Sequence, residues 1–425
     1  MSWIIIGKIM QSILGMVISM LTARFLGPSN FGVINYASAI ATFMIPIMQL
    51  GFNNVMVYEL KKYPEEEGQI IGTVLILSAV SSLFCISCCT SFVLIANFGE
   101  KETIVICVLY SLMLFFQSFD LIQYWFQAKL LSKYSSIASL IAYLVMSVYK
   151  IFLLATGKNV VWFALSNSFD YIFIALLCFV FYKKKQGQKL SFSAKVGKRI
   201  FGESKHYIIP GLMVTIYGQT DKIMLKLMVE NSATGFYSTA LSCVSISGFV
   251  FNAIIDSFRP VIFEAKQDGR EETYEKRLST LYHIVAYLGI IQSLVLTIFA
   301  KWVIDLLYGA DYAEASPALQ ILCWYVIFSY FGSIRNIWML SENKQKYLWI
   351  INLIGAALNV ALNFALIPFF GVRGAAVASL STEVLCNFAL GFVFPPIRKN
   401  SFIMLKGLNP LFLLKYLRRN NDEKN

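Results

Sequence analysis

The sequence predicts an all-α membrane protein with about twelve transmembrane helices, arranged as two six-helix lobes around a central cavity. Of the 425 residues, 57% are hydrophobic and only 14% are charged. The mean hydropathy of +0.65 is far above that of an ordinary soluble domain. Apolar runs of roughly 20 residues, which suffice to cross a hydrocarbon layer about 30 Å thick, recur along the whole chain. The two halves of the chain also resemble each other.

Twelve apolar runs are the predicted spans, and the segments between them are short. The first span begins at Trp3 with no basic leader and no small-residue cleavage site, which predicts a retained helix and not a signal peptide. The predicted spans are residues 3–23, 33–57, 69–97, 103–128, 134–156, 159–182, 207–229, 235–258, 278–300, 317–340, 347–369 and 374–395.

Basic residues predict the orientation of these spans, because Lys and Arg in short loops stay cytoplasmic. With the N-terminus inside, cytoplasmic segments hold 26 of the 36 basic residues, external loops hold five and the spans hold five. We therefore expect a multi-pass protein of the bacterial cytoplasmic (inner) membrane with both termini in the cytoplasm. The net charge of +12 then reflects topology and attraction to anionic lipid headgroups. No base-reading motif is present, so nucleic acid is not an expected partner.

A densely basic stretch, "YKKKQGQKLSFSAKVGKRIFGESKH", divides the chain near its middle. It predicts an N-terminal lobe at 1–185, a basic cytoplasmic linker at 186–206, a C-terminal lobe at 207–398 and a cytoplasmic basic tail at 399–425. In the linker, Phe192, Val196 and Ile200 recur at every fourth position. This spacing favours a short helix in the cytoplasmic headgroup zone, and a solvated linker is the alternative.

Three local matches between the halves indicate a duplication. "FGVINYA" at 31–37 resembles "TGFYSTA" at 234–240, and "VMVYELKK" at 55–62 resembles "PVIFEAKQ" at 260–267. Trp125 precedes a Lys-Tyr pair at the same spacing as Trp338 does. Because six spans is an even number, both halves would insert the same way up. That plan predicts a substrate site between the halves.

Glycines and cysteines have mainly structural interpretations. Gly27-Pro28 and the segment "PFFGVRGAA", which contains Gly371, predict tight external turns. Gly27-Pro28, Gly309 and Gly371 are candidate hinge or gate positions. The eight cysteines lie in or at the ends of apolar spans, where packing is their expected role. With only two histidines in the chain and no matching Cys or His pair, we expect no metal site.

Charges inside the apolar stretch "YGQTDKIMLKLMV", residues 217–229, require an explanation. A charge at the centre of the bilayer costs about 2.5–3.5 kcal/mol on insertion scales. Lys222 and Lys226 lie four residues apart on one helix face and repel each other unless an anion joins them. We hypothesise that this span lines a hydrated cavity in which both lysines meet a phosphate-bearing substrate. The alternative is a structural ion pair of Lys222 with Asp170 or Glu383.

Further polar residues within the spans complete the candidate site. For several of the cations, snorkelling to the membrane surface is the alternative, and for the amides helix packing is the default. The diphosphate-binding candidates are Lys222, Lys226, Lys8, Lys150 and Arg335. The candidates for ion coupling or charge pairing are Asp221, Asp170, Glu383 and Asp120. The sugar-contact candidates are Gln219, Asn53, Asn54, Asn359 and Asn363.

The sequence gives no sign of an enzyme. It has no Gly-rich phosphate loop and no cytoplasmic segment large enough to hydrolyse nucleotide. We expect no cofactor, and any work must come from ion gradients or voltage, with H+ or Na+ coupling left open.

Four blocks resemble the polysaccharide transporter family, the Wzx-type flippases of lipid-linked O-antigen within the multidrug/oligosaccharidyl-lipid/polysaccharide exporter superfamily. They are "TARFLGPSNFGVINYASAI" at 22–40, "QTDKIML" at 219–225, "VIDLLYGADYAEASPALQIL" at 303–322 and "NLIGAALNVALNFALIPFFGVRGAAVASLSTE" at 352–383. The resemblance implies a flippase that moves undecaprenyl-diphosphate-linked oligosaccharide units of O-antigen or capsule type from the inner to the outer leaflet by alternating access. Membrane-bound polymerase and chain-length proteins are the partners it implies.

Two further functions remain as alternatives. A cation-coupled multidrug exporter of the same superfamily would favour an acidic and aromatic cavity. A repeat-unit polymerase or ligase resembles proteins with a large external loop, and the longest external segment here, 301–316, is short. Lipid II flippases of the superfamily carry several basic residues in span one, whereas this span offers Lys8 and the terminal Arg24.

Overall fold

The computed structural model describes residues 2–409, and their side chains from residue 14 onward; within this part all regular structure is helical. The α-helices up to residue 245 are α1 (Ser2–Met48), α2 (Met56–Lys62), α3 (Glu67–Ala96), α4 (Lys101–Ser111), α5 (Met113–Gln117), α6 (Gln123–Ala128), α7 (Ser132–Ala155), α8 (Val160–Lys184), α9 (Ala194–Ser204), α10 (Ile208–Met228) and α11 (Asn231–Ser245). The later α-helices are α12 (Gly248–Gln267), α13 (Glu271–Leu307), α14 (Ser316–Ser341), α15 (Leu348–Val384), α16 (Leu390–Val393) and α17 (Arg398–Leu408).

Short turns of other helix types join these elements. A π-helical turn, η7 (Leu385–Ala389), lies between α15 and α16. The 3-10 turns are η1 (Phe52–Asn54), η2 (Pro64–Glu66), η3 (Ser118–Ile122), η4 (Lys205–Tyr207), η5 (Ala310–Ala315), η6 (Gln345–Tyr347) and η8 (Pro395–Ile397).

Eight of the described helical segments are long and apolar enough to cross a membrane, or nine if the bent pair α11 and α12 is one span. The segment containing α1 and the one containing α15 each hold two predicted spans. α10 carries three charged residues and is not among the eight. The protein is therefore a multi-pass, all-α membrane protein. The predicted number of twelve spans is compatible with this set.

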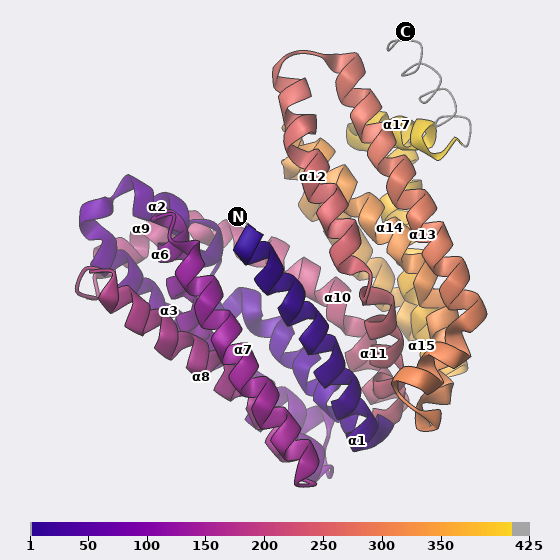
Figure 1. The fold of residues 1–425 in the computed structure, drawn as a ribbon, viewed down its shortest axis with the longest axis horizontal. Helices are drawn as coiled ribbons and strands as arrows, with labels where there is room; N and C mark the ends of the chain where they lie inside the picture. Colours follow the sequence, from indigo (N-terminus) through magenta and orange to yellow (C-terminus); the bar gives the residue numbers. More distant parts are fainter. Residues whose placement is uncertain (1, 410–425) are drawn as a thin grey trace. The chain divides into compact units, whose positions relative to one another are not determined.

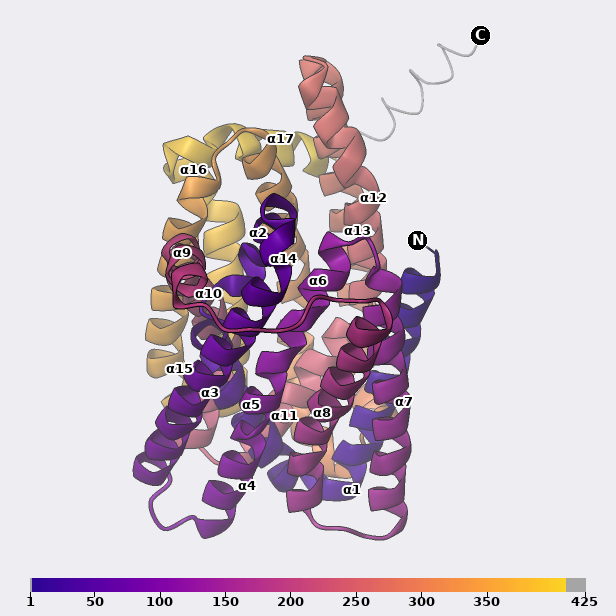
Figure 2. The same cartoon turned by 90° about the vertical axis from the view of Figure 1, so that its left-hand side faces the viewer.

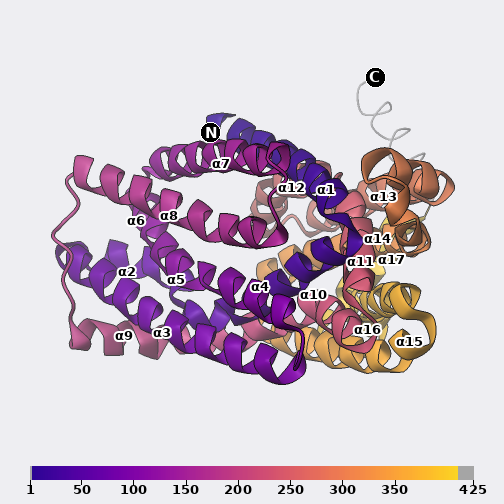
Figure 3. The same ribbon diagram turned by 90° about the horizontal axis from the view of Figure 1, so that it is seen from below.

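The chain forms two compact units, residues up to Ser238 and residues from Thr239 onward. Within the first unit, α10 packs against α1 and α7 packs against α8 (Figure 3). Within the second, α12 and α13 form a long antiparallel pair (Figure 1). Because α10 is packed on α1, it groups with the helices that precede the linker. The lobes at 1–185 and 207–398 remain a prediction about the duplicated sequence.

Glycines in positive-φ backbone break the long helices where turns were predicted. α1 is two helices joined at Gly27, with φ 72° and ψ 170°, and Pro28 follows at the start of the second helix. α15 is likewise two helices joined at Gly371, with φ 53° and ψ −127°. Gly309, with φ 92°, precedes η5. L-residues rarely adopt these conformations, so the turns at Gly27 and Gly371 both require glycine. Whether any of the three acts as a hinge remains a prediction.

The second span ends earlier than the sequence predicted. Its helix stops at Met48 instead of continuing to residue 57. Gly51 then adopts φ 71°, and a Cβ there would lie 2.3 Å from the backbone oxygen of Ser204. The close approach of the α9 end requires glycine at this turn. Asn53 and Asn54 therefore lie in η1, outside the helix in which they were predicted to contact sugar.

The linker does form a short helix, α9, but two of the predicted apolar positions face protein. Val196 and Ile200 are buried and belong to a core with residues of α2, α3 and α8. The segment before α9 crosses one end of the first unit (Figure 2). Its Ser193 N–H donates to Thr73 Oγ1 at 2.9 Å. Of the three residues, only Phe192 remains exposed and available to headgroups.

The structure adds a fourth match to the three seen in the sequence of the two halves. α9 follows the sixth predicted span and packs on α3, whereas α17 follows the twelfth and packs on α13. Both helices have 11 residues. Trp125 and Trp338, which were matched in sequence, are both buried. The same helix therefore recurs at the same place in each half, as a duplication requires.

We expect Gly27→Ala to lower the stability of the protein by about 1–3 kcal/mol, because alanine is strained at φ 72°. A Cβ at Gly27 meets nothing within 4 Å, so the effect isolates the backbone. Gly202→Ala in α9 is the matched control. It also meets no atom, lies in ordinary helix, and is expected to stabilise by up to about 1 kcal/mol. Thermal unfolding in detergent measures both variants. Equal changes in stability would contradict the strain that we assign to alanine at position 27.

Candidate functional site

The polar residues of α10 that the sequence singled out have three different environments in the first unit. Asp221 and Lys226 are buried, whereas Gln219 and Lys222 are partly exposed. Ile223, on the same helix, packs against a core formed by α1, α3, α4 and α8. The apolar packing therefore fixes the rotation of α10, and each polar group meets a different neighbour.

Asp221 is held by the next helix. Its Oδ2 accepts a hydrogen bond from the Tyr237 hydroxyl on α11 at 2.5 Å. One turn earlier on α11, the Thr234 hydroxyl donates to the carbonyl oxygen of Lys222 at 3.0 Å. These two bonds join the end of α10 to the start of α11. They give Asp221 a structural role, and its part in ion coupling remains a prediction.

Lys222 forms no ion pair with a carboxylate of the described residues. Its Nζ donates to Gln219 Oε1 at 3.3 Å, one turn back on α10. Within the first unit, no ion pair of Lys222 with Asp170 forms among the described residues, and the alternative pairing with Glu383 remains a prediction. Asp221, its neighbour in sequence, interacts with it electrostatically but does not bond it, and a cation in an apolar helix without a directly bonded carboxylate keeps much of its desolvation cost. The predicted role of Lys222 in binding an anion remains a prediction.

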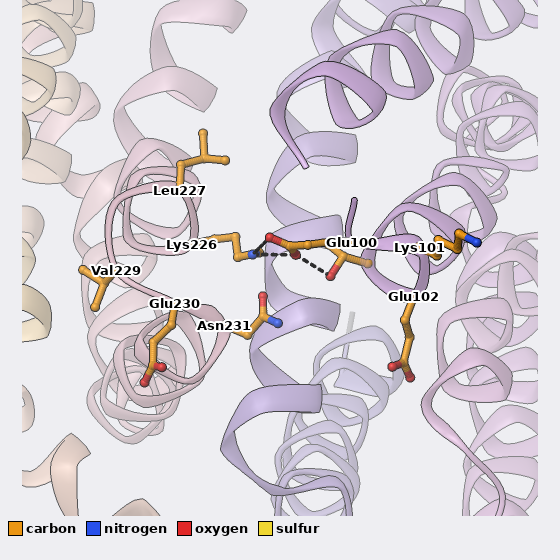
Figure 4. A pocket seen from close by; sticks show the side chains of 9 residues that line it. Glu100, Lys101, Glu102, Lys226, Leu227, Val229, Glu230 and Asn231 are labelled. Carbon is orange, nitrogen blue, oxygen red and sulfur yellow. Dashed lines mark hydrogen bonds and ion pairs between the residues drawn. The ribbon is translucent and has the colours of Figure 1, made fainter. Parts of the chain in front are cut away.

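Lys226 has a carboxylate partner that sequence reasoning missed. Its Nζ lies 2.8 and 2.7 Å from the two carboxylate oxygens of Glu100. Thr103 Oγ1 donates to Glu100 Oε2 at 2.9 Å, and Figure 4 shows the Lys226 side chain directed toward Glu100. Lys226 and Lys222 therefore do not share one anion here. Glu100 lies 126 residues away in sequence, so no local pattern connects it to α10.

An open pocket of about 540 Å³ lies beside this ion pair. Residues just before and within the first turn of α4 form one wall, and the end of α10 with the following residues forms the other. Its lining is Glu100, Lys101, Glu102, Thr103, Lys226, Leu227, Val229, Glu230 and Asn231. The pocket thus contains a buried ammonium close to open space.

A second polar group lies deeper in the first unit. Asp120, in the 3-10 turn η3, accepts from Gln123 Nε2 at 2.6 Å. Asp170 on α8 interacts electrostatically with Asp120 and with Lys150 on α7. Neither Lys150 nor Asp170 forms a close ion pair within the described part of the chain, and Asp170 Oδ1 is buried without a hydrogen-bond donor there. Asp170 is therefore the acidic candidate with an unused oxygen.

The candidates of the second unit have hydrogen-bond partners within that unit. Arg335 is buried and its Nη1 donates to the carbonyl of Cys386 in η7 at 3.0 Å. Glu383 is buried and accepts from Asn387 Nδ2. Asn363 Nδ2 donates to Asn359 Oδ1 at 3.0 Å. Arg335 thus does not snorkel to the surface but bonds a carbonyl of the π-helical turn.

Lys8 lies in α1, but its side chain falls outside the described part of the chain. Asn54 Nδ2 bonds the side chain of Asn53 at 2.8 Å within η1. The structure therefore brings candidates together on α10, around Asp170 in the first unit, and around Cys386, which Arg335 and Glu383 share as a neighbour. Asn359 and Asn363 form a separate bonded pair. The substrate and sugar contacts assigned to these residues remain predictions.

The cysteines have the packing environment that the sequence predicted. All eight are free thiols, and all but Cys88 are buried. No three His, Cys, Asp or Glu side chains of the described residues converge as a metal site would require.

Comparison with known proteins identifies the family. A family model described as "Polysaccharide biosynthesis protein" matches residues 1–266, more than half of the chain. The protein therefore belongs to the polysaccharide biosynthesis protein family, and the family resemblance predicted from the four sequence blocks is confirmed. A second model, MatE, matches residues 207–365.

Two curated relatives cover most of the chain. The capsular polysaccharide biosynthesis protein CapF of Staphylococcus aureus is 23% identical over 389 residues, 88% of this chain and 93% of CapF. The putative O-antigen transporter of Escherichia coli K12 is 22% identical over 379 residues, 85% of this chain and 88% of the relative.

Two solved structures share the fold. An inward-facing multidrug resistance MATE family transporter of the MOP superfamily matches with a TM-score of 0.71 and 14% identity, over 93% of this chain and 96% of that one. The lipid II flippase MurJ, in an inward closed conformation, matches with a TM-score of 0.69 and 15% identity, over 98% of this chain and 93% of that one. The predicted fold class is confirmed.

We expect the Lys226–Glu100 pair to stabilise the protein only above acidic pH. Burial raises the pKa of Glu100, but hydrogen bonds from Lys226 and Thr103 outweigh burial and hold its pKa below the usual 4.5. A depressed carboxyl pKa contributes stability above the unfolded value, and this stability is lost as pH falls through the folded value. Melting temperatures of the native protein and Glu100→Gln should therefore differ near neutral pH and converge below about pH 4. A difference that persists unchanged at low pH would contradict this.

Proposed function

We propose that the protein is a flippase that moves undecaprenyl-diphosphate-linked oligosaccharide repeat units from the inner to the outer leaflet of the bacterial cytoplasmic membrane. Family membership, relatives named for capsule synthesis and O-antigen transport, and a fold shared with transporters support this. Both termini lie in the cytoplasm in this proposal, in keeping with the distribution of basic residues. Polymerase and chain-length proteins are its proposed membrane partners.

The observation that carries the proposal is the environment of Lys222. An ammonium in an apolar helix needs a counter-charge or water, yet no described carboxylate pairs with it. A diphosphate supplies two negative charges and several acceptor oxygens at once. Gln219 accepts from the same ammonium through Oε1. Its side-chain NH2 group can donate to a sugar hydroxyl or a phosphate oxygen. Lys222 with Gln219 is therefore the proposed first contact of the headgroup.

The other candidate cations take secondary places in this proposal. Lys226 has its own carboxylate, and Arg335 bonds a backbone carbonyl. Lys150 is attracted to Asp170. Lys8 and Lys150 remain proposed contacts along the path of the headgroup, and alternating access between the two halves remains the proposed mechanism.

Membrane voltage supplies enough energy for the outward step. An inside-negative potential favours outward movement of negative charge by about 2.3 kcal/mol per charge per 100 mV. A diphosphate with about two charges thus gains roughly 4–5 kcal/mol. Coupling to H+ or Na+ is not required by this energy, and Asp170 is the carboxylate we propose for it if it occurs.

We expect Lys222→Met to reduce transport about 10- to 100-fold, because it removes one charge-assisted contact to phosphate. Lys222→Arg retains the positive charge and should retain part of the activity. Lys158→Met, at an exposed lysine outside the site, is the matched control. The measurement is accumulation of lipid-linked repeat units on the cytoplasmic leaflet of cells that carry each variant. Normal transport by an inserted, folded Lys222→Met protein would reject the role of Lys222.

Transport in proteoliposomes should continue after the H+ and Na+ gradients are collapsed, provided that the voltage is held, because voltage alone supplies the energy. Collapse of the voltage should slow it strongly. If transport stops with the ion gradients, it is ion-coupled, and Asp170→Asn should then abolish the dependence on the coupling ion.

A further inference from the structure

The pocket beside Lys226 combines a buried cation with an exposed carboxylate. Lys226 is 8% exposed, whereas the Glu100 side chain is 43% exposed. The carboxylate therefore covers the ammonium from the open side of the pocket. Figure 4 shows Lys226 extended toward Glu100 and Lys101 pointing away from the pair. An anion that entered the pocket would meet the ammonium only by taking the place of Glu100.

Glu100 is suited to being displaced. It is the N-cap residue of α4, yet its side chain makes no capping bond to that helix. Its hydrogen-bond partners are Lys226 and Thr103, and Asn97 also lies close enough to stabilise the carboxylate. An exposed carboxylate that leaves this position is solvated by water at small cost. The ammonium it leaves behind is buried and requires a new anion.

The place it vacates has the features of an oxyanion site. The ammonium bonds two carboxylate oxygens at 2.8 and 2.7 Å, and two phosphate oxygens offer the same geometry. The Thr103 hydroxyl can donate to either anion. The N-terminus of α4, which has 11 residues, adds a favourable dipole. A volume of about 540 Å³ also leaves room for the first sugar.

The acidic residues that also line the pocket weaken the binding of an anion. Glu102 and Glu230 line the same pocket and repel a diphosphate. Lys226 lies one helical turn beyond Lys222 on the same face of α10, about 6 Å further along the axis. A headgroup released from Lys222 would thus meet Lys226 next. Weak binding at the second lysine suits release more than capture.

We propose that this pocket is an exit subsite for the diphosphate of a polyprenyl-linked oligosaccharide, in which the diphosphate displaces Glu100 from Lys226. This inference rests on the proposed function. Glu100 acts as an intramolecular stand-in for phosphate, which keeps Lys226 neutralised when no substrate is present. The subsite selects for an anionic headgroup and makes no contact that specifies the sugar.

The test measures binding of inorganic pyrophosphate and of farnesyl diphosphate to the full-length protein in nanodiscs by calorimetry. Glu100→Gln removes the competing anion and should tighten binding about tenfold. Glu100→Asp, one methylene shorter, should lie between this variant and the native protein. The double variant Lys226→Gln with Glu100→Gln should bind no more tightly than the native protein. Glu203→Gln, at an exposed carboxylate of α9 outside the pocket, is the control and should stay within about twofold of the native protein.

Unchanged or weaker binding by a folded Glu100→Gln protein would overturn the subsite and leave the ion pair purely structural. If that variant does not fold, a Glu100→Asp protein that binds no more tightly than the native protein overturns it as well. Deletion of the gene separates the two proposals. If lipid-linked units accumulate after deletion but Glu100→Gln does not bind diphosphate more tightly, only the subsite is rejected. If Glu100→Gln binds diphosphate more tightly but deletion causes no accumulation of lipid-linked units, the anion subsite stands and the flippase function is rejected.

Discussion

A charge placed in an apolar helix must find a partner, and this constraint organises the polar interior of the protein. Each buried ion costs several kcal/mol unless a counter-charge or hydrogen bonds offset it. On α10, Asp221 is held by Tyr237 and Lys226 by Glu100. Lys222 is left with an amide oxygen. Two of the three charges on α10 therefore have bonded partners, and the third, Lys222, is the position at which we propose that an anion binds.

The sequence predicted the features that depend on local patterns. Apolar runs of spanning length located the long helices, and Gly27 and Gly371 marked the turns between them because few other residues adopt positive φ. The spacing of Val196 and Ile200 located α9. The sequence could not tell which surface that apolar face meets, because lipid and a protein core present the same hydrophobicity. Nor did the apolar pattern show that Gly51 ends the helical region before Asn53.

The pairing of charges depends on contacts between distant segments and could not be predicted. The sequence identified Lys222 and Lys226 as residues that need an anion; the structure pairs Lys226 with a carboxylate, and an anion at Lys222 remains a prediction. It could not show that Glu100, in a loop 126 residues away, supplies the anion for Lys226. It also could not show that Arg335 reaches the carbonyl of Cys386, because this contact joins residues 51 positions apart in the sequence. Family membership then gave the context in which we propose an acidic, lipid-linked headgroup as the anion.

The central claim is that Lys222 lies in water and close to the diphosphate, and cysteine labelling tests it most directly. With the eight native cysteines replaced, Lys222→Cys should react with a charged, membrane-impermeant thiol reagent in sealed membranes. Farnesyl diphosphate should slow this reaction, whereas a neutral farnesol control should not. A cysteine at position 222 that stays unreactive while one at Val229 reacts would place the side chain against lipid or packed protein, and would contradict the account.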